Sequence, residues 1–297
     1  MTRHMLTGCC TALVTPFDAG GSVDFDAFGK LVDWQIAEGV HGLVPVGSTG
    51  EAATMTLDER VAVVRRCAER AAGRVPVVAG ASANDTRVAI DTAKAMGGTG
   101  ATHLLYASPS YSKPPQRGIL AHFRAIADAS PLPIVLYNIP GRTASNVEAE
   151  TTLALAEHAN IVGIKEASGN MAQISEVIRH APKGFSVLSG DDNVVLAVIA
   201  EGGHGVVSVI SNAVPRAMAD LCSRALEGKM ESARVLHLRL HSLMRAAFSE
   251  SNPIPIKASL AMMGRVRNQL RLPLVPMDTM HEAKLRASLV EAGALAT

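Results

Sequence analysis

Short, strongly apolar segments alternate with longer segments of helical periodicity along most of this sequence. The apolar segments occupy residues 9–14, 41–46, 75–80, 102–107, 133–138, 160–165, 185–190 and 204–209. Most are apolar throughout instead of alternating with polar residues, which is typical of strands buried on both faces of a parallel sheet. Between them, apolar residues recur at helical spacing, as Phe28, Leu31, Val32 and Ile36 do. The alternation therefore favours a parallel sheet covered by helices.

Eight strands that each precede a helix predict an α/β fold of the (β/α)8 type, a TIM barrel. An open, doubly wound sheet is the alternative, but no GxGxxG turn follows the first strand. The Gly-rich stretch at 97–102 ends a helix instead of opening one. Strand-like segments stop near residue 228, and the rest of the sequence has helical periodicity. We therefore expect a catalytic barrel over residues 1–227 and a C-terminal helical extension over residues 228–297.

The composition argues against nucleic acid or a membrane as a partner. The formal net charge is +1, and the sequence contains no block of like charges. The longest apolar run, at 194–200, is too short to span a bilayer, and the N-terminus lacks the apolar region of a signal peptide. The four cysteines form neither a disulfide framework nor a CxxC metal motif. We expect a cytoplasmic protein with reduced cysteines.

Lys165 directly follows an apolar run, at the end of the sixth predicted strand. In a TIM barrel the active site lies at the carboxyl ends of the strands. A buried ammonium is costly, so such a lysine either acquires a partner or loses its proton. A neutral amine can attack a carbonyl group and form a Schiff base. Alternatively, Lys165 extends its ammonium to solvent or pairs with the neighbouring Glu166.

Other groups with suitable chemistry fall at the same predicted edge. Tyr111 and Tyr137 lie at the ends of the fourth and fifth strands, and a phenol close to Ser48 could move protons to and from an imine. The GSTG turn that contains Thr49 could bind a carboxylate or phosphate through its backbone N–H groups. Arg142 could bind a second carboxylate through both of its terminal nitrogens. Each feature also has an ordinary structural explanation, because tyrosines, Gly-rich turns and solvated arginines are common in loops.

Local signals also predict where helices begin. Thr56 and Glu59 have the spacing of a capping box, and Asn84, Asn170 and an aspartate at 191–192 are further candidate N-caps. The two adjacent aspartates could instead bind a cation, but acidic residues are ordinary at the start of a helix. Two histidines spaced i, i+4 near the C-terminus lack the acidic residue of an HExxH motif. These features do not predict a metal site.

Eight short motifs follow one another along nearly the whole chain. They are TALVTPF, GSTGE, SPSYSKP, YNIPGRT, GIKEASG, SGDD, GGHGVVSV and NPIPIK. The series resembles that of the dihydrodipicolinate synthase / N-acetylneuraminate lyase superfamily of class I aldolases, and it is far more specific than any single motif. The resemblance implies a barrel with three added helices, and a lyase that needs no metal or organic cofactor because a lysine forms an imine with pyruvate.

The resemblance also implies the catalytic residues. Lys165 matches the residue that forms the Schiff base, and Tyr137, Ser48 and Tyr111 match the groups that relay protons. Tyr111 would reach the site across a tight dimer interface, within a homotetramer built as a dimer of tight dimers.

The same resemblance implies how substrates are bound. Thr49 matches the position that holds the carboxylate of pyruvate, the carbonyl of Val207 matches the one that orients the lysine, and Gly190 of the SGDD motif belongs to the substrate site. Arg142 resembles the arginine that binds the carboxylate of aspartate semialdehyde in the synthase branch. The expected partners are therefore pyruvate and aspartate semialdehyde, on the route to diaminopimelate and lysine.

Ser48 keeps one alternative open, because the synthases usually have threonine at this position and serine retains the hydroxyl without the methyl group that stiffens χ1. This alternative is another pyruvate-dependent class I aldolase, or a dehydratase or lyase that acts on a 2-oxo sugar acid. A second alternative, from a different class, is a pyruvate-binding paralogue without catalytic activity, but the competent side chains at every relay position argue against it.

Feedback inhibition by lysine is expected to be weak or absent. Lysine-inhibited members of the superfamily typically carry histidines, a glutamate and a second tyrosine at positions where this chain has Leu57, Arg60, Val88 and Ser110. Of the expected residues, only Asn84 is retained. An ammonium ligand would therefore meet little negative charge or aromatic surface.

Overall fold

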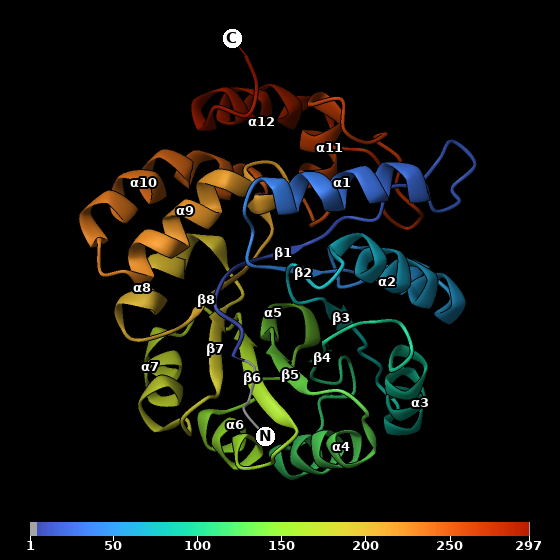
Figure 1. Cartoon of the computed structure of the whole chain (residues 1–297), viewed down its shortest axis with the longest axis vertical. Helices are drawn as coiled ribbons and strands as arrows, with labels where there is room; N and C mark the ends of the chain where they lie inside the picture. Colours follow the sequence, from blue (N-terminus) through green and yellow to red (C-terminus); the bar gives the residue numbers. More distant parts are fainter. Residues whose placement is uncertain (1–4, 297) are drawn as a thin grey trace.

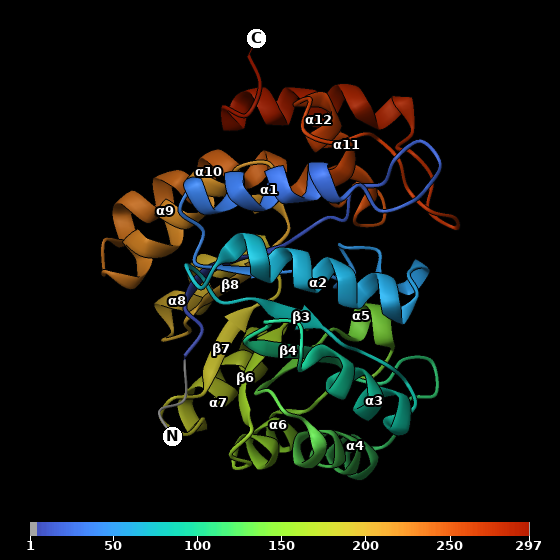
Figure 2. The same ribbon diagram turned by 45° about the vertical axis from the view of Figure 1, so that its right-hand side comes forward.

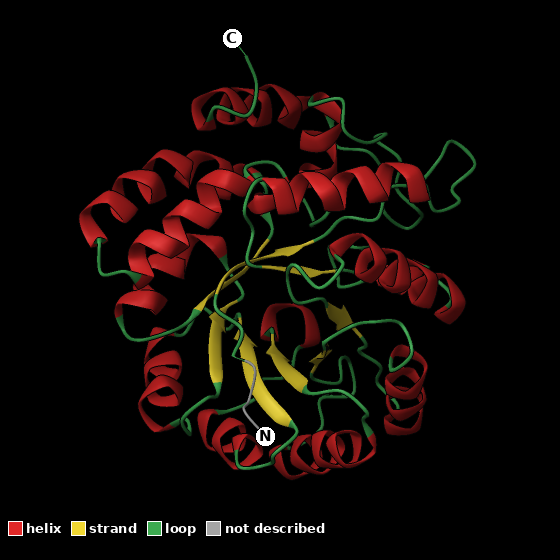
Figure 3. Ribbon diagram, viewed as in Figure 1, coloured by secondary structure: helices red, strands yellow, loops and turns green. Residues whose placement is uncertain are grey.

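The computed structural model, which describes residues 5–296, confirms the predicted TIM barrel (Figures 1 and 3). Within these residues, eight strands are hydrogen-bonded in the order β2-β1-β8-β7-β6-β5-β4-β3, and the registered pairs are parallel. The strands are β1 Gly8–Ala12, β2 Gly42–Val44, β3 Val78–Gly80, β4 His103–Ala107, β5 Ile134–Asn138, β6 Ile161–Glu166, β7 Ser186–Ser189 and β8 Gly205–Ser208. Each overlaps one of the predicted apolar segments.

The two edge strands of this order, β2 and β3, meet and close the barrel. Leu43 forms an isolated parallel bridge with Val77, and its N–H donates to the carbonyl of Pro76 over 3.0 Å. Further along, the N–H of Gly80 donates to the carbonyl of Pro45 over 3.0 Å. Closure pairs backbone groups that the edges of an open sheet would expose. It therefore excludes the doubly wound alternative.

Helices surround the barrel, and a further group follows it in sequence (Figure 2). Around the strands lie α1 Phe25–Ala37, α2 Leu57–Ala71, α3 Thr86–Met96, α4 Gln116–Ala129, α5 Pro140–Thr143, α6 Ala149–Ala156, α7 Met171–His180, α8 Val195–Ala200 and α9 Pro215–Leu226. The later helices are α10 Met230–Ala246, α11 Ile254–Met262 and α12 Thr279–Ala292. Helix α10 packs against α9 and α12, and both views place α12 beyond α1, away from α4 and α6. Among the described helices, none has both the length and the apolar character needed to cross a membrane.

Alternate strand residues fill two separate apolar layers. One layer lies inside the barrel, and the other, which includes Ile164, lies between the barrel and the helices. The inner layer contains Ala12, Val44, Val78, Leu105, Val135, Tyr137, Val162, Leu188 and Val207. Because successive strand residues point to opposite faces, Lys165 is directed inward while Ile164 and Glu166 are directed toward the helices.

The predicted helix starts are partly confirmed. Thr56 and Glu59 form the complete capping box at the start of α2, and Asn170 accepts a hydrogen bond from the N–H of Gln173 at the start of α7. The prediction for Asn84 is wrong, because Asp85 caps α3. The Asn84 side-chain oxygen accepts from Ser110 instead, which ties the loop after β3 to the loop after β4.

Candidate active site

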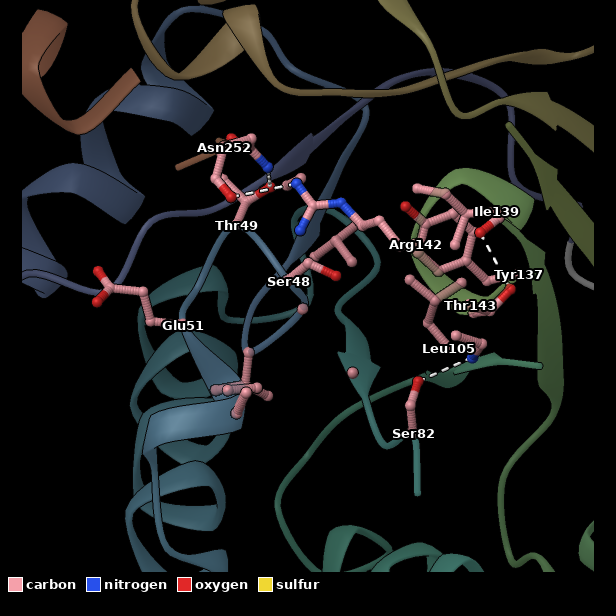
Figure 4. A pocket seen from close by; sticks show the side chains of 18 of the residues that line it. Ser48, Thr49, Glu51, Ser82, Leu105, Tyr137, Ile139, Arg142, Thr143 and Asn252 are labelled. Carbon is pink, nitrogen blue, oxygen red and sulfur yellow. Dashed lines mark hydrogen bonds between the residues drawn. The ribbon is translucent and has the colours of Figure 1, made fainter. Parts of the chain in front are cut away.

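A cavity of about 730 Å³ opens at the carboxyl ends of the strands (Figure 4). Its wall includes side chains from the loops that follow β2, β3, β4, β5 and β7, together with residues that precede α11. Six of the eight predicted site residues line it, namely Ser48, Thr49, Tyr137, Arg142, Lys165 and Gly190. The barrel therefore brings together residues that are separated by up to 142 positions in the sequence.

Lys165 lies at the inner face of β6, directly beside Tyr137 on β5 in the strand register. Its Nζ atom is 4.1 Å from the centroid of the Tyr137 ring, and the residue is only 6% exposed. The electron-rich face of an aromatic ring stabilises a nearby cation, but it does not bind the proton as a carboxylate would. The alternative pairing with Glu166 is excluded by the opposite directions of the two side chains.

Glu166 is instead held on the outer face of the barrel. Its carboxylate accepts from the side-chain nitrogens of Asn138 and Gln173, each over 3.0 Å, and from the N–H of Ser168 over 2.6 Å. A buried carboxylate with this many donors is satisfied without a lysine. Lys165 therefore keeps its amine free for the cavity.

Gly190 packs against the side chain of Lys165, which explains why this position requires glycine. A Cβ atom built at Gly190 would lie 2.5 Å from the Cβ of Ala167 and 3.2 Å from the Cε of Lys165. The N–H of Gly190 also donates to the carbonyl of Glu166 over 2.6 Å. A larger residue would push the Lys165 side chain away from its present position.

The GSTGE turn at residues 47–51 is held in a tight conformation at the rim of the cavity. Val46 and Glu51, which flank its central residues, have φ values of 50° and 57°, in the left-handed region that few non-glycine residues adopt. Thr49 is buried, and its hydroxyl accepts a hydrogen bond of 2.9 Å from the amide nitrogen of Asn252. Ser48 remains exposed to the cavity. The turn therefore offers one constrained and one accessible hydroxyl.

Arg142, on the short helix α5 after β5, extends toward the same turn. Its Nη2 atom donates to the carbonyl of Asn252 over 3.1 Å, and Figure 4 shows its guanidinium group close to Ser48 and Thr49. Asn252 thus joins Arg142 and Thr49 through its backbone and its side chain. Sequence reasoning missed this residue, because the NPIPIK motif that contains it carries no recognisable chemistry of its own.

Beneath the turn, Glu51 and Lys257 form an ion pair whose side chains are both 0% exposed. Their charged atoms lie 2.5 Å apart, and the Glu51 carboxylate also accepts from the N–H of Arg271 over 3.0 Å. Burial lowers the pKa of the Lys257 ammonium, and the nearby Glu51 only partly offsets this effect. The pair connects the turn to helix α11 and to the chain beyond it, so the C-terminal helices support the site.

Two predicted site residues lie elsewhere. Tyr111 is 92% exposed, has a φ of 68°, and does not line the cavity of the single chain. Val207 is paired with Cys10 of β1 and contributes to the inner apolar layer, below the cavity. The roles that the resemblance implies for these two residues therefore stay predictions.

One side of the cavity is lined by the residues that bear on lysine inhibition. Arg60, Asn84 and Ser110 all line it. Burial lowers the pKa of the Arg60 guanidinium, and within residues 5–296 its Nε atom has no hydrogen-bond partner. This region therefore carries a positive charge where an ammonium ligand would need a negative one.

Comparison with known proteins agrees with this geometry. A family model described as the Dihydrodipicolinate synthetase family matches residues 5–292. The 4-hydroxy-tetrahydrodipicolinate synthase of Maridesulfovibrio salexigens is 48% identical over 96% of this chain and 98% of its own, and that of Koribacter versatilis is 50% identical over 98% and 97%. The crystal structure of dihydrodipicolinate synthase from Thermotoga maritima superimposes with a TM-score of 0.96 at 41% identity, covering 98% of this chain and 100% of that one.

Proposed function

Because this chain belongs to the dihydrodipicolinate synthetase family, we propose that it joins pyruvate to L-aspartate 4-semialdehyde through an imine on Lys165. It is an enzyme of the lyase type, with the activity of a 4-hydroxy-tetrahydrodipicolinate synthase. The proposed chemistry is supported by the position of Lys165, which lies at the cavity beside Tyr137 and has no carboxylate from residues 5–296 bonded to its amine.

The first half of the proposed reaction activates pyruvate. The amine of Lys165 attacks C2, and loss of water leaves a protonated imine. The positive nitrogen then acidifies C3, so that a proton leaves and an enamine forms. The lysine nitrogen acts as the electron sink in this scheme, which therefore proceeds without a metal or an organic cofactor.

The second half forms the carbon–carbon bond. The enamine carbon attacks the aldehyde of the semialdehyde, and the amine of the product then displaces Lys165 and closes the ring. Thr49 and the backbone of its turn would hold the carboxylate of pyruvate, while Arg142 would hold that of the semialdehyde. The hydrogen bonds through Asn252 support this division, because they fix Arg142 and Thr49 relative to each other.

Tyr137, Ser48 and Tyr111 would relay the protons in these steps. Tyr137 and Ser48 line the cavity, whereas the high exposure of Tyr111 is expected of a residue that serves the site of a second copy. We therefore propose a homotetramer, built as a dimer of tight dimers, in the cytoplasm. We also propose residues 1–227 as the catalytic barrel and residues 228–297 as its helical extension.

Trapping with borohydride tests the proposed imine. Borohydride added with pyruvate should inactivate the enzyme and add one reduced pyruvyl group to the peptide that contains Lys165. Arg142→Ala should prevent turnover of the semialdehyde while leaving the pyruvate adduct intact. Absence of the mass shift at Lys165 would refute the imine mechanism, and semialdehyde turnover by the Arg142→Ala variant would refute the assigned binding role.

A further inference from the structure

Asp191 places an unpaired carboxyl group at the cavity, next to the reactive lysine. It follows β7 and lines the cavity together with Lys165 and Gly190. It also occupies the N-cap position of the short 3-10 helix at Asp192–Val194, but its side chain makes no capping bond there. Within residues 5–296, no hydrogen bond or ion pair of this carboxyl group is found. The expected capping role is therefore wrong for Asp191.

The neighbouring Asp192, in contrast, is buried and hydrogen-bonded to the backbone, as expected of an aspartate with a structural role. Asp192 is 2% exposed, and one of its oxygens accepts from the N–H groups of Val209 and Ile210, each over 3.0 Å. These bonds fasten the loop after β8. Among residues 5–296, Asp191 makes no comparable bond, although the two residues are adjacent, and its position in the cavity wall leaves it available to a ligand.

The charge that Asp191 faces is the Lys165 ammonium. Burial raises the pKa of the Asp191 carboxyl, and the positive charge of Lys165 partly offsets this effect. In the proposed reaction that positive charge disappears, because the lysine nitrogen becomes the neutral nitrogen of an enamine. A partly buried carboxylate is then left without a neighbouring cation, which is unfavourable unless another cation arrives.

The second substrate carries such a cation. Aspartate semialdehyde has a carboxylate and an ammonium group on the same carbon, and both must be bound while its aldehyde meets the enamine. Arg142 follows β5 and Asp191 follows β7, so the two oppositely charged side chains flank Lys165 on β6. Neighbouring strands lie about 4.8 Å apart, which puts β5 and β7 roughly 10 Å from each other, a gap that the long Arg142 side chain and a small substrate can bridge.

We propose that Asp191 binds the α-ammonium group of aspartate semialdehyde and then removes one of its protons for ring closure. This inference rests on the proposed function and adds a binding and catalytic residue to it. The ammonium must lose a proton before it can act as a nucleophile, and a carboxylate within a sheltered cavity is a suitable base for that transfer.

Ring closure begins with a proton transfer and ends with release of the lysine. The ammonium transfers one proton to the Asp191 carboxylate, leaving a neutral amine and a carboxylic acid. The amine lone pair attacks C2 of the protonated imine, so a carbon–nitrogen bond forms and the π electrons move to the lysine nitrogen. A proton then passes from the ring nitrogen to the lysine nitrogen. The bond from C2 to Lys165 breaks as the ring nitrogen forms a C=N bond, which leaves a protonated cyclic imine and the free lysine amine.

Two aldehyde substrates, one with an amine and one without, test whether Asp191 acts on the substrate ammonium. Asp191→Asn is compared with the native enzyme and with Asp26→Asn, which neutralises an exposed aspartate in the first turn of α1. Succinic semialdehyde has the same aldehyde and carboxylate but no amine. Its aldol adduct is trapped on Lys165 with borohydride and quantified by mass spectrometry. Turnover of aspartate semialdehyde is followed with a coupled reductase.

For Asp191→Asn we expect kcat/KM with aspartate semialdehyde to fall about 10²-fold or more, with kcat reduced and KM raised. Formation of the pyruvate adduct and of the succinic semialdehyde adduct should stay within about twofold of the native rates, which also shows that the variant is folded. Asp26→Asn should match the native enzyme with both aldehydes.

Other results would overturn the inference. Equal losses with both aldehydes, or a slower pyruvate adduct, would mean that Asp191 acts on Lys165 and not on the substrate ammonium. Native turnover by Asp191→Asn would mean that it has no role. If the native enzyme formed the pyruvate adduct but failed to use aspartate semialdehyde, the proposed function itself would be wrong, and the inference with it.

Discussion

Two buried lysines in this chain each face an aromatic ring, but they differ in whether a carboxylate is bonded to the amine. Lys165 lies 4.1 Å from the centroid of the Tyr137 ring, and Lys257 lies 4.2 Å from that of Phe17. Lys257 is fully buried and bonded to Glu51, while Lys165 borders the cavity and, among residues 5–296, no carboxylate is bonded to its amine. A lysine with a buried counter-ion is held as a structural cation, whereas one without such a counter-ion is available for reaction.

The difference also separates two functions of the fold. The Lys257 region joins the C-terminal helices to the turn at 47–51, so it sets the shape of the cavity wall. In the proposed reaction, the Lys165 region supplies the reacting atom. We therefore expect substitutions in the first region to act mainly on stability, and substitutions in the second to act mainly on turnover.

The largest effect is expected for Lys165→Met. Without the amine no imine can form, so turnover should fall roughly 10⁴-fold or more. No carboxylate among residues 5–296 is hydrogen-bonded to the amine, and only the Asp191 carboxyl loses a neighbouring positive charge, so the free energy of unfolding should fall by less than about 1 kcal/mol. A coupled assay and urea denaturation measure the two quantities. Residual turnover close to the native rate would contradict the assignment of Lys165.

The same substitution at the other lysine should have the opposite profile. Lys257→Met leaves the Glu51 carboxylate buried without its counter-ion, and we expect it to lower the free energy of unfolding by about 3–5 kcal/mol. The double variant Lys257→Met/Glu51→Gln should recover part of that loss, because the buried charge is removed. Urea denaturation of both variants provides the measurement. A loss below about 1 kcal/mol, as is usual for exposed ion pairs, would contradict a structural role for the pair.

Tyr137→Phe tests the contribution of the Tyr137 hydroxyl group to turnover, because it keeps the aromatic ring. The ring would still face the Lys165 ammonium, but one donor in the proposed proton relay would be lost. Turnover should fall roughly 10²-fold, while the borohydride-trapped pyruvate adduct should still form. If the variant turned over at the native rate, the relay would not include this phenol.

The Glu59–Arg271 pair, which contacts the buried ion pair through the N–H of Arg271, should make the free energy of unfolding depend on pH in the acid range. The hydrogen bond from Arg271 lowers the pKa of the Glu59 carboxyl from its ordinary value of 4.5 to about 2. A lowered carboxyl pKa stabilises the folded state above the unfolded-state value, and this contribution is lost as the pH falls from about 4.5 to about 2. Urea denaturation across this range should therefore show a smaller pH dependence for Glu59→Gln than for the native protein. Identical curves would contradict the effect.

The smallest effect is expected from added lysine. Arg60 carries a positive charge in the part of the cavity lined by Asn84, and the Asn84 side-chain oxygen already accepts from Ser110. Lysine at sub-millimolar concentration should therefore leave the steady-state rate unchanged. Clear inhibition in that range would contradict this expectation.

Much of the site could be predicted because the carboxyl ends of all the strands lie at the same end of a barrel. Tyr137 and Lys165 lie near the carboxyl ends of apolar strands and Arg142 follows one closely, so the barrel brings the three residues together whatever the details of packing. Asn252 and Lys257 could not be found in this way. They come from the chain after the barrel, and only the packing of α11 shows that they meet the turn at 47–51.

The sequence by itself determined which reactive residues lie at the end of which strand, and to which family the chain belongs. Hydrophobic periodicity and motif spacing, on which both conclusions depend, are local properties of the chain. The tertiary structure alone decided which charges are paired. It placed Glu166 on the outer face away from Lys165 and gave Lys257 a buried counter-ion. It also left the Asp191 carboxyl group beside the cavity without a partner in the described part of the chain, although Asp192 is bonded. Pairing depends on the directions of side chains from segments far apart in sequence, which no local pattern specifies.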